Sequence, residues 1–346
     1  MTKKEQRRGD DIRQVIVDTI AATRISTRSL KKPAQIRDFL RQYFANVPVE
    51  DLQGRSEKIM ARIALDHLEF GARRPSGKAL VRVFNATKKT HGYESAFTFV
   101  EMVNDDMPFL VDSLSAAILQ HKMAVHITVH PIISIKRDRQ GKVREISSPS
   151  DEETHSESFI RLAVDRISDK GEIEALQKEI ENVLVDVRLA VRDWGKMRQR
   201  MRLTRDLLEY GPSDADPLLR SESQALLDWM ADDHFTFLGY REYTLTKSGK
   251  RQVLKSVPGT GLGVLSRDDK VSKSIELSNE MQRLVREKDW LILTKANSRS
   301  TVHRATFLDY VGVKIYNRNG RVVGERRFIG LLTSIAYSES PRNIPL

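Results

Sequence analysis

The sequence predicts an α+β protein with a helical N-terminal region, a ferredoxin-like βαβ sandwich and a second mixed, mostly antiparallel α+β domain. Three observations support this fold class. Apolar residues recur three and four positions apart up to residue 71, as they do in amphipathic helices. From Ala79 the period changes to the alternation of β-strands, interrupted by one helical stretch. Beyond residue 220, strand patterns and turn residues predominate.

Residues 1–78 are expected to form the helical N-terminal region. Pro33 suits the first turn of one helix, and Gly71 suits the end of another. Helical spacing is found over 10–24, 33–46 and 56–71.

The basic residues of the chain are concentrated in the same part. The formal net charge is +11, and residues 1–90 hold 20 Lys+Arg against 10 Asp+Glu. These basic side chains are interspersed with acidic and apolar ones, as on solvated helix faces, and they do not form the clustered stripe of a nucleic-acid-binding arm. Nucleic-acid binding through the basic N-terminus is therefore kept only as an unfavoured alternative.

Residues 79–209 predict one domain of four strands and two helices. After the second strand, the string VNDDMPFLVDSLSAAILQH indicates a turn and a helix, with Asp105 or Asp106 as the cap and Pro108 in the first turn. A long helix follows the fourth strand. The strand–helix–strand unit favours a ferredoxin-like sandwich that leaves one sheet face open. The strands are expected over 80–84, 97–103, 125–135 and 158–167.

A domain boundary is expected at YGPSDADPLLR, residues 210–220, because glycine, proline and aspartate cluster there. The second domain then covers 221–346. Asn319-Gly320 between two β-rich runs predicts a tight hairpin, and a helix is expected over about 274–288.

Composition and spacing exclude several kinds of chemistry. Because the chain has no cysteine, it has no disulfides, thiolate nucleophiles or Cys-ligated metal centres. The run PGTGLGVL (258–265) lacks the third glycine and the following helix of a dinucleotide-binding loop, so a β-turn is expected. His126 and His130, on one strand, would lie roughly 13 Å apart at ~3.3 Å per residue, too far to share one ion. We therefore predict no metal site and no catalytic residue, and no apolar run is long enough for a membrane span.

The turn Asn104-Asp105-Asp106 is the best candidate for a ligand site. Three small polar residues lie between a strand and a helix, where exposed N–H groups meet short side chains. Helix capping is the simpler explanation. The alternative is an effector site for a small amino acid, and we include His126 and His130 of the neighbouring polar strand face in that hypothesis.

A second, weaker candidate is the polar segment TKANSRSTVHR (294–304). If it is a strand, Lys295, Arg299 and His303 lie on one side and form an anion-binding face. A charged edge strand that resists aggregation is the more common explanation for such a pattern.

Several long strings resemble the N-terminal region of the large bacterial NAD-specific glutamate dehydrogenases, in the same order over about residues 80–346. The strings are VNDDMPFLVDS (103–113), His126 with His130-Pro131, ESFI (157–160), DDHFTFLGYREY (232–243), LTKANSRSTVHR (293–304), LDYVGVK (308–314) and VVGERRFIGLLTSIAY (322–337).

The resemblance implies a parent chain of well over a thousand residues with ACT-type domains, a PAS-like module and a downstream catalytic region. In that family L-glutamate is oxidatively deaminated to 2-oxoglutarate and ammonium with NAD. The sequence stops at SPRNIPL, where the family continues, so no catalytic or NAD-binding residue is carried over. We therefore expect a non-catalytic regulatory and oligomerisation segment of a cytoplasmic homo-oligomer, which binds no cofactor itself and works with the catalytic region of the same chain. A stand-alone amino-acid sensor is the alternative.

Overall fold

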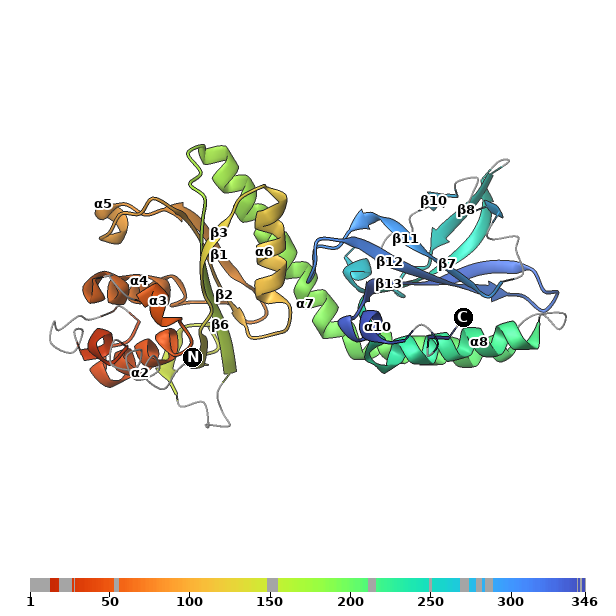
Figure 1. Cartoon of the computed structure of the whole chain (residues 1–346), viewed down its shortest axis with the longest axis horizontal. Coiled ribbons are helices and arrows are strands. Elements are labelled where there is room, and N and C mark those ends of the chain that lie inside the picture. The colour runs from red at the N-terminus through yellow and green to blue at the C-terminus, as the bar shows by residue number, and fades with distance from the viewer. Residues whose placement is uncertain are drawn as a thin grey trace. The chain divides into compact units, whose positions relative to one another are not determined.

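The computed structural model describes residues 13–18, 27, 29–52, 56–147, 155–210, 216–248, 251–267, 274–277, 282–283, 289–340, 342 and 344–345. Backbone contacts divide the chain into two compact units, Met1–Leu184 and Val185–Leu346. Each unit contains an antiparallel sheet with helices (Figure 1), so the predicted α+β class is confirmed. Among the described helices, none is long and apolar enough to cross a lipid bilayer.

Unit 1 is built on an antiparallel sheet in the order β1-β2-β6-β4-β5, with β3 also paired to β6. Strand β6 lies antiparallel between β2 and the pair β3/β4, and helix α6 connects β2 to β3, so the predicted strand–helix–strand unit is present. The strands are β1 (Leu80–Asn85), β2 (Thr98–Asp105), β3 (Val125–Val129), β4 (Ile132–Arg137), β5 (Val143–Ile146) and β6 (His155–Val164).

The strand predicted over 125–135 is divided in two. β3 pairs with the C-terminal half of β6 and β4 with its N-terminal half. Pro131 lies between them and, having no N–H, cannot donate to the ladder. Its carbonyl oxygen still accepts from the N–H of Phe159 at 3.0 Å, so the two short strands follow one continuous partner.

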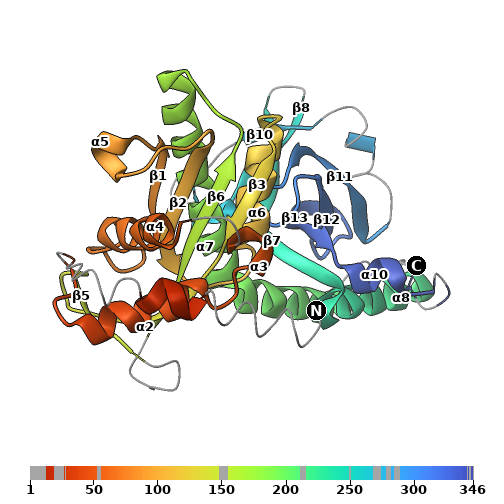
Figure 2. The ribbon, with the colours of Figure 1, turned by 60° about the vertical axis from the view of Figure 1, so that its left-hand side comes forward.

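Helices cover both faces of this sheet, which corrects the prediction of an open face. Helices α2 (Pro33–Phe44), α3 (Val49–Leu52) and α4 (Glu57–Phe70) lie on one side, and α6 (Leu110–Gln120) lies on the other with the start of α7 (Lys170–Leu207) (Figure 2). Phe39 and Leu68 of the N-terminal helices pack with Val103, Ile133 and Phe159 of the sheet in one buried core. The amphipathic N-terminal helices therefore supply the cover that the sheet needs. The short helix α5 (Lys88–His91) follows β1.

The predicted cap of the helix after β2 is wrong. Helix α6 begins at Leu110, after Pro108, and its N-cap is Phe109 with a φ of 72° and no side-chain cap bond. Asp105 and Asp106 lie upstream because other partners hold their carboxylates, as described below.

Unit 2 contains the C-terminal half of α7 and a sheet in the order β10-β8-β7-β13-β12-β11, with β9 paired to β7. The predicted Asn319-Gly320 turn is confirmed between β12 and β13, and Gly320 has a φ of 70°. The elements are η1 (Leu208–Tyr210), α8 (Pro217–Trp229), η2 (Met230–His234), β7 (Phe235–Ser248), β8 (Arg251–Ser256), β9 (Leu262–Gly263), η3 (Val264–Ser266), β10 (Ser274–Glu276), β11 (Leu291–Arg299), β12 (Phe307–Tyr316), β13 (Val322–Leu332) and α10 (Ser334–Ser338).

Unit 2 differs from the predictions in one helix and in where it begins. The helix expected over about 274–288 begins instead with strand β10, and most of its remainder lies outside the described residues. The domain boundary is expected at 210–220, whereas backbone contacts divide the chain within α7, between Leu184 and Val185. The C-terminal half of α7 belongs to unit 2 because Met197 and Met201 pack in the same core as Phe237 of β7.

Candidate functional site

The end of β2 and the turn after it are held by neighbouring side chains. Asn104 is fully buried. Asp105 forms an ion pair with Arg74, whose guanidinium also donates to Glu157 at 2.9 Å. Arg137 binds Glu157 as well, through Nε at 2.6 Å and Nη2 at 2.7 Å. Two arginines and two carboxylates thus fix the end of β2 against β6 and β4.

Asp106 and His130 are brought together through Ser158. The Ser158 hydroxyl donates to Asp106 Oδ1 at 2.6 Å, and His130 Nε2 lies 3.0 Å from the same hydroxyl. Since the hydroxyl hydrogen goes to Asp106, His130 acts as the donor and cannot take a proton from the serine. Burial lowers the pKa of His130, against the opposing influence of Asp106. The chain of bonds is a structural link and is not arranged as a nucleophile with its base.

His126 lies apart from this group. Its Nε2 is 2.7 Å from Asp165 Oδ1, and its ring packs 4.8 Å from that of Phe97. The structure therefore joins Asp106 to His130 and places His126 elsewhere. Among the described residues, no group of three or more His, Asp or Glu side chains is arranged to hold a metal ion.

The predicted anion face in unit 2 does not form one row. Lys295 and Arg299 lie on β11, but the register shifts between them, and His303 follows the strand with a φ of 67°. Lys295 is paired with Asp309 of β12. Arg299 lies over the Phe307 ring, 4.7 Å from its centroid.

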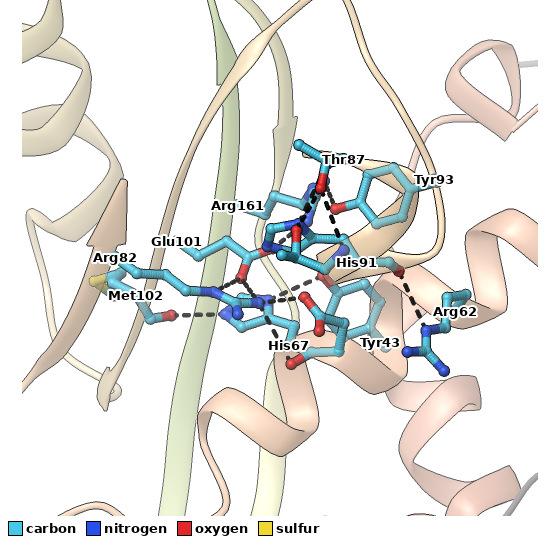
Figure 3. A network of polar contacts seen from close by, with 12 residues as sticks. Tyr43, Arg62, His67, Arg82, Thr87, His91, Tyr93, Glu101, Met102 and Arg161 are labelled. Atoms are coloured by element: carbon cyan, nitrogen blue, oxygen red, sulfur yellow. Dashed lines mark hydrogen bonds and ion pairs between the residues drawn. The ribbon is translucent and has the colours of Figure 1, made fainter. Parts of the chain in front are cut away.

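A row of buried and half-buried charges crosses the sheet of unit 1 and was not singled out from the sequence. Arg82, Glu101 and Arg161 face one another on β1, β2 and β6. Figure 3 shows both guanidinium groups directed at the Glu101 carboxylate. Arg82 Nε donates to Oε2 at 2.8 Å, and Arg161 pairs with Oε1. Asp66 Oδ2 of α4 accepts from Arg82 Nη2 at 2.6 Å, and the same nitrogen also pairs with Glu101.

The charges in this row balance. Glu101 is fully buried. Burial raises the pKa of its carboxyl group, but His67, Arg161 and Arg82 lower this pKa by a larger amount, so that it is about 2. The carboxylate is therefore ionised at neutral pH, and Arg82, Arg161, Glu101 and Asp66 carry no net charge together. Arg161 also lies 3.7 Å from the centroid of the Phe99 ring, which adds a cation–π contact.

Next to this row, His67 has a fixed tautomer. Its Nε2 is 3.2 Å from the carbonyl oxygen of Met102, which can only accept, so Nε2 carries the proton. Nδ1 then accepts from the Tyr43 hydroxyl at 3.0 Å (Figure 3). Burial lowers the pKa of His67 to about 4, and burial also raises the pKa of Tyr43. Both side chains are therefore neutral at physiological pH.

A cavity of about 340 Å³ opens beside these groups, between the N-terminal helices and the sheet. This volume lies within the ~300–1,000 Å³ of small-molecule pockets. Phe44, Ile63, Phe99, Ile127 and Val129 contribute apolar walls, and Tyr43, Tyr93 and Arg161 contribute polar atoms. Of the described parts of unit 1, this cavity is the best candidate for a ligand site.

A signal in the sequence pointed to this cluster. Arg82, Glu101 and Arg161 each lie inside an otherwise apolar strand run, in LVRVF, TFVEMV and FIRLAV. A charge in such a run is stable only if it is paired, so opposite charges in several runs predict cross-strand partners. Sequence spacing alone could not predict that α2 and α4 pack on this sheet and cover the cluster.

Comparison with known proteins supports one family. Residues 39–180, which include β1–β6 and most of the cavity wall, match the model of the glutamate dehydrogenase ACT1 domain. The chain is 33% identical over 321 residues to the NAD-specific glutamate dehydrogenase of Halomonas elongata, which covers 91% of this chain and 20% of that protein. The resemblance to NAD-specific glutamate dehydrogenases is confirmed.

A second NAD-specific glutamate dehydrogenase, from Pseudomonas aeruginosa, is 31% identical over 315 residues, 90% of this chain and 19% of that protein. The chain thus spans about a fifth of the length of the curated relatives that it matches. The ACT1 match lies within unit 1 and ends in the first part of α7, whereas the pairwise similarity covers nine-tenths of the chain.

Proposed function

We propose that this chain is a regulatory and assembly segment of an NAD-dependent glutamate dehydrogenase. The observation that carries the proposal is similarity over nine-tenths of the chain to only a fifth of such enzymes, together with the ACT1 match. Oxidative deamination of L-glutamate to 2-oxoglutarate with NAD then belongs to a catalytic region elsewhere in the parent. The homo-oligomeric, cytoplasmic state and the ferredoxin-like plan of unit 1 with a PAS-like unit 2 form part of the proposal.

The geometry of the polar groups supports a scaffolding and ligand-sensing role. The carboxylates of Glu101 and Glu157 are buried and held by arginines, and Ser158 donates to Asp106. None of these contacts presents an activated nucleophile or a general base to solvent, whereas the cavity in unit 1 presents apolar walls with few polar atoms.

The experiment compares the chain with its parent. Glutamate-dependent NADH formation is measured for the 346-residue chain, where we expect no turnover, and for the whole enzyme with and without residues 39–180. Removing these residues should change the subunit assembly or the response to effectors in the whole enzyme. Turnover by the chain alone, or a truncated enzyme identical to the whole one in mass and effector response, would contradict the proposal.

The amino-acid site hypothesised at Asn104, Asp105 and Asp106 with His126 and His130 stays a prediction. For a ligand ammonium to reach Asp106, the aspartate must give up the bond from Ser158. Calorimetry of the chain with a panel of amino acids, repeated with Asp106→Asn, tests it: heat that this substitution does not change places binding outside the turn.

A further inference from the structure

The cavity of unit 1 has an apolar interior formed from both layers of the unit. Ile59, Met60 and Ile63 come from α4, and Ile127 and Val129 come from β3. Tyr93, whose hydroxyl accepts from Arg161 Nη2 at 2.8 Å, has its own hydroxyl hydrogen left to donate. The interior can therefore take an apolar body and offer one hydrogen bond to a small acceptor.

Acidic side chains outnumber basic ones in the described lining of this cavity, and Arg13, outside the lining, donates to the carbonyl oxygens of Phe44 and Val47. Among the described residues, the acidic and basic side chains that line the cavity are Asp51, Glu94 and Arg161. Arg161 is balanced by Glu101, so the two carboxylates remain. Glu94 lies 3.6 Å from Lys88, but both side chains are largely exposed and the pair is weak. Asp51 is half-buried near the end of α3, and Ser56 lines the same cavity.

These features favour a ligand with a positive charge over one with a negative charge. An anion would bring a negative charge towards Asp51 and would find Arg161 already paired, so it is disfavoured. A cationic group at the rim gains from Asp51 while its apolar body removes surface from water. Neighbouring Ser56 and Ser95 add hydroxyl groups at the same lining.

We propose that this cavity binds a small molecule with an apolar body and an ammonium group, with the body among Ile63, Phe99 and Ile127 and the ammonium at Asp51. The proposal names a ligand class for the proposed regulatory function, and its biological role rests on that function. Ligand binding is measured on this chain without the parent enzyme, so a failure of the cavity to bind is distinguishable from a failure of the proposed regulatory function.

The test uses probes of similar shape and different charge, titrated by calorimetry into the 346-residue chain at pH 7. They are 2-phenylethylamine, 2-phenylethanol and 3-phenylpropanoate. An exposed or half-buried ion pair contributes little, so we expect the amine to bind about two- to five-fold more tightly than the alcohol, with the carboxylate weakest. L-phenylalanine and L-leucine are titrated as well. If they bind as tightly as 2-phenylethylamine, the natural ligand is an amino acid. If they bind more weakly, it is an amine without a carboxylate.

Substitutions then locate the probe. Ile63→Trp fills the cavity and should abolish binding of the amine and the alcohol, whereas Leu119→Trp on the exposed face of α6 should leave both unchanged. Asp51→Asn should remove the preference for the amine and leave the alcohol affinity unchanged. Asp38→Asn, at an exposed position of α2, is its matched control and should change neither.

Each outcome decides the proposal. No binding of the amine, tightest binding of the carboxylate, or an amine affinity insensitive to Ile63→Trp would overturn it. If Ile63→Trp fails to fold by circular dichroism, Ile127→Trp fills the same cavity from β3 and replaces it. Loss of amine binding in that variant, with the Leu119→Trp control unchanged, supports the site.

Discussion

Glu101 lies in the middle of β2 with no exposure to solvent, where an isolated carboxylate would be far too costly to ionise. It is stable there because Arg82 and Arg161 occupy the facing positions of the neighbouring strands. Removing one member of such a group leaves buried charges without compensation, whereas the intact group contributes little net stability. Single substitutions in this row should therefore lower the unfolding free energy strongly.

We expect Glu101→Gln to lower the unfolding free energy of unit 1 by about 3–5 kcal/mol, because both arginines lose their buried counter-charge. All three tryptophans, Trp194, Trp229 and Trp290, lie in unit 2. Urea unfolding followed by far-UV circular dichroism should shift, while the tryptophan fluorescence transition should not.

The control is Glu174→Gln, which removes an exposed partner of Lys170 on α7. Its effect should stay within about 0.5 kcal/mol. Equal effects of the two substitutions would contradict the role given to the buried row.

His67 gives the chain a dependence on pH of known sign. Its native pKa of about 4 lies below the unfolded value of 6.5, so below pH 6.5 the unfolded state takes up a proton that the native state refuses. The unfolding free energy should be highest above pH 6.5 and fall by about 2–3 kcal/mol towards pH 4.5. Urea unfolding by circular dichroism at several pH values measures this.

Burial also lowers the pKa values of His91 and His130, which act in the same direction. The contribution of His67 is therefore the difference between the native chain and His67→Gln, whose stability should change less over this range. A variant with the same slope as the native chain would show that His67 does not carry the effect.

At the scale of elements, local patterns predicted most of the strands and the β12–β13 turn, since alternation and Asn-Gly chemistry act between near neighbours, but they missed β5 and β10. They did not predict the start of α6. The sequence offers Asp105 and Asp106 as caps, but Arg74 and Ser158, which are distant in sequence, hold these carboxylates. The cover of the sheet by α2 was missed for the same reason.

Gln42 connects α2 to that sheet. Its Oε1 accepts from the N–H of Ser134 at 2.8 Å, and its Nε2 donates to the carbonyl oxygen of Ser147 at 2.9 Å. Gln42→Ala leaves both backbone groups without this partner and should cost about 1–3 kcal/mol. Hydrogen exchange at Ser134 should become faster.

Arg41→Ala, at the adjacent exposed position, is the control and should leave this exchange unchanged. Unchanged protection of Ser134 in Gln42→Ala would show that α2 does not depend on this connection.

At the scale of the whole molecule, the sequence predicted two α+β parts but placed the boundary by composition, at the turn-rich residues 210–220. Composition marks where a chain can turn and does not show which core a helix joins. Buried apolar residues recur at helical spacing in α7 from Leu176 to Met201, on both sides of the division, so this periodicity contains no sign of a change of partner. The candidate cavity was also beyond prediction, because it depends on α3 and α4 meeting β3 and β6.

Two fragments of the chain, one beginning at residue 185 and one at residue 221, distinguish the two boundaries. A fragment of residues 185–346 retains Met197, Met201 and Leu208, which pack with Leu227 and Phe237 in the core of unit 2. It also retains Asp193, which accepts from the N–H of Gly263 at 3.1 Å. A fragment of residues 221–346 lacks all of α7, and losing several large buried side chains costs about 2–5 kcal/mol for each of them.

Because a domain is stable by only about 5–15 kcal/mol, the longer fragment should unfold cooperatively in urea, followed by tryptophan fluorescence, and the shorter one should not. Both fragments keep Trp229 and Trp290, and the longer one also keeps Trp194, so the shape and midpoint of each transition are compared and not the fluorescence amplitude. A cooperative transition of equal midpoint in the 221–346 fragment would place the boundary at the turn and remove α7 from the core of unit 2.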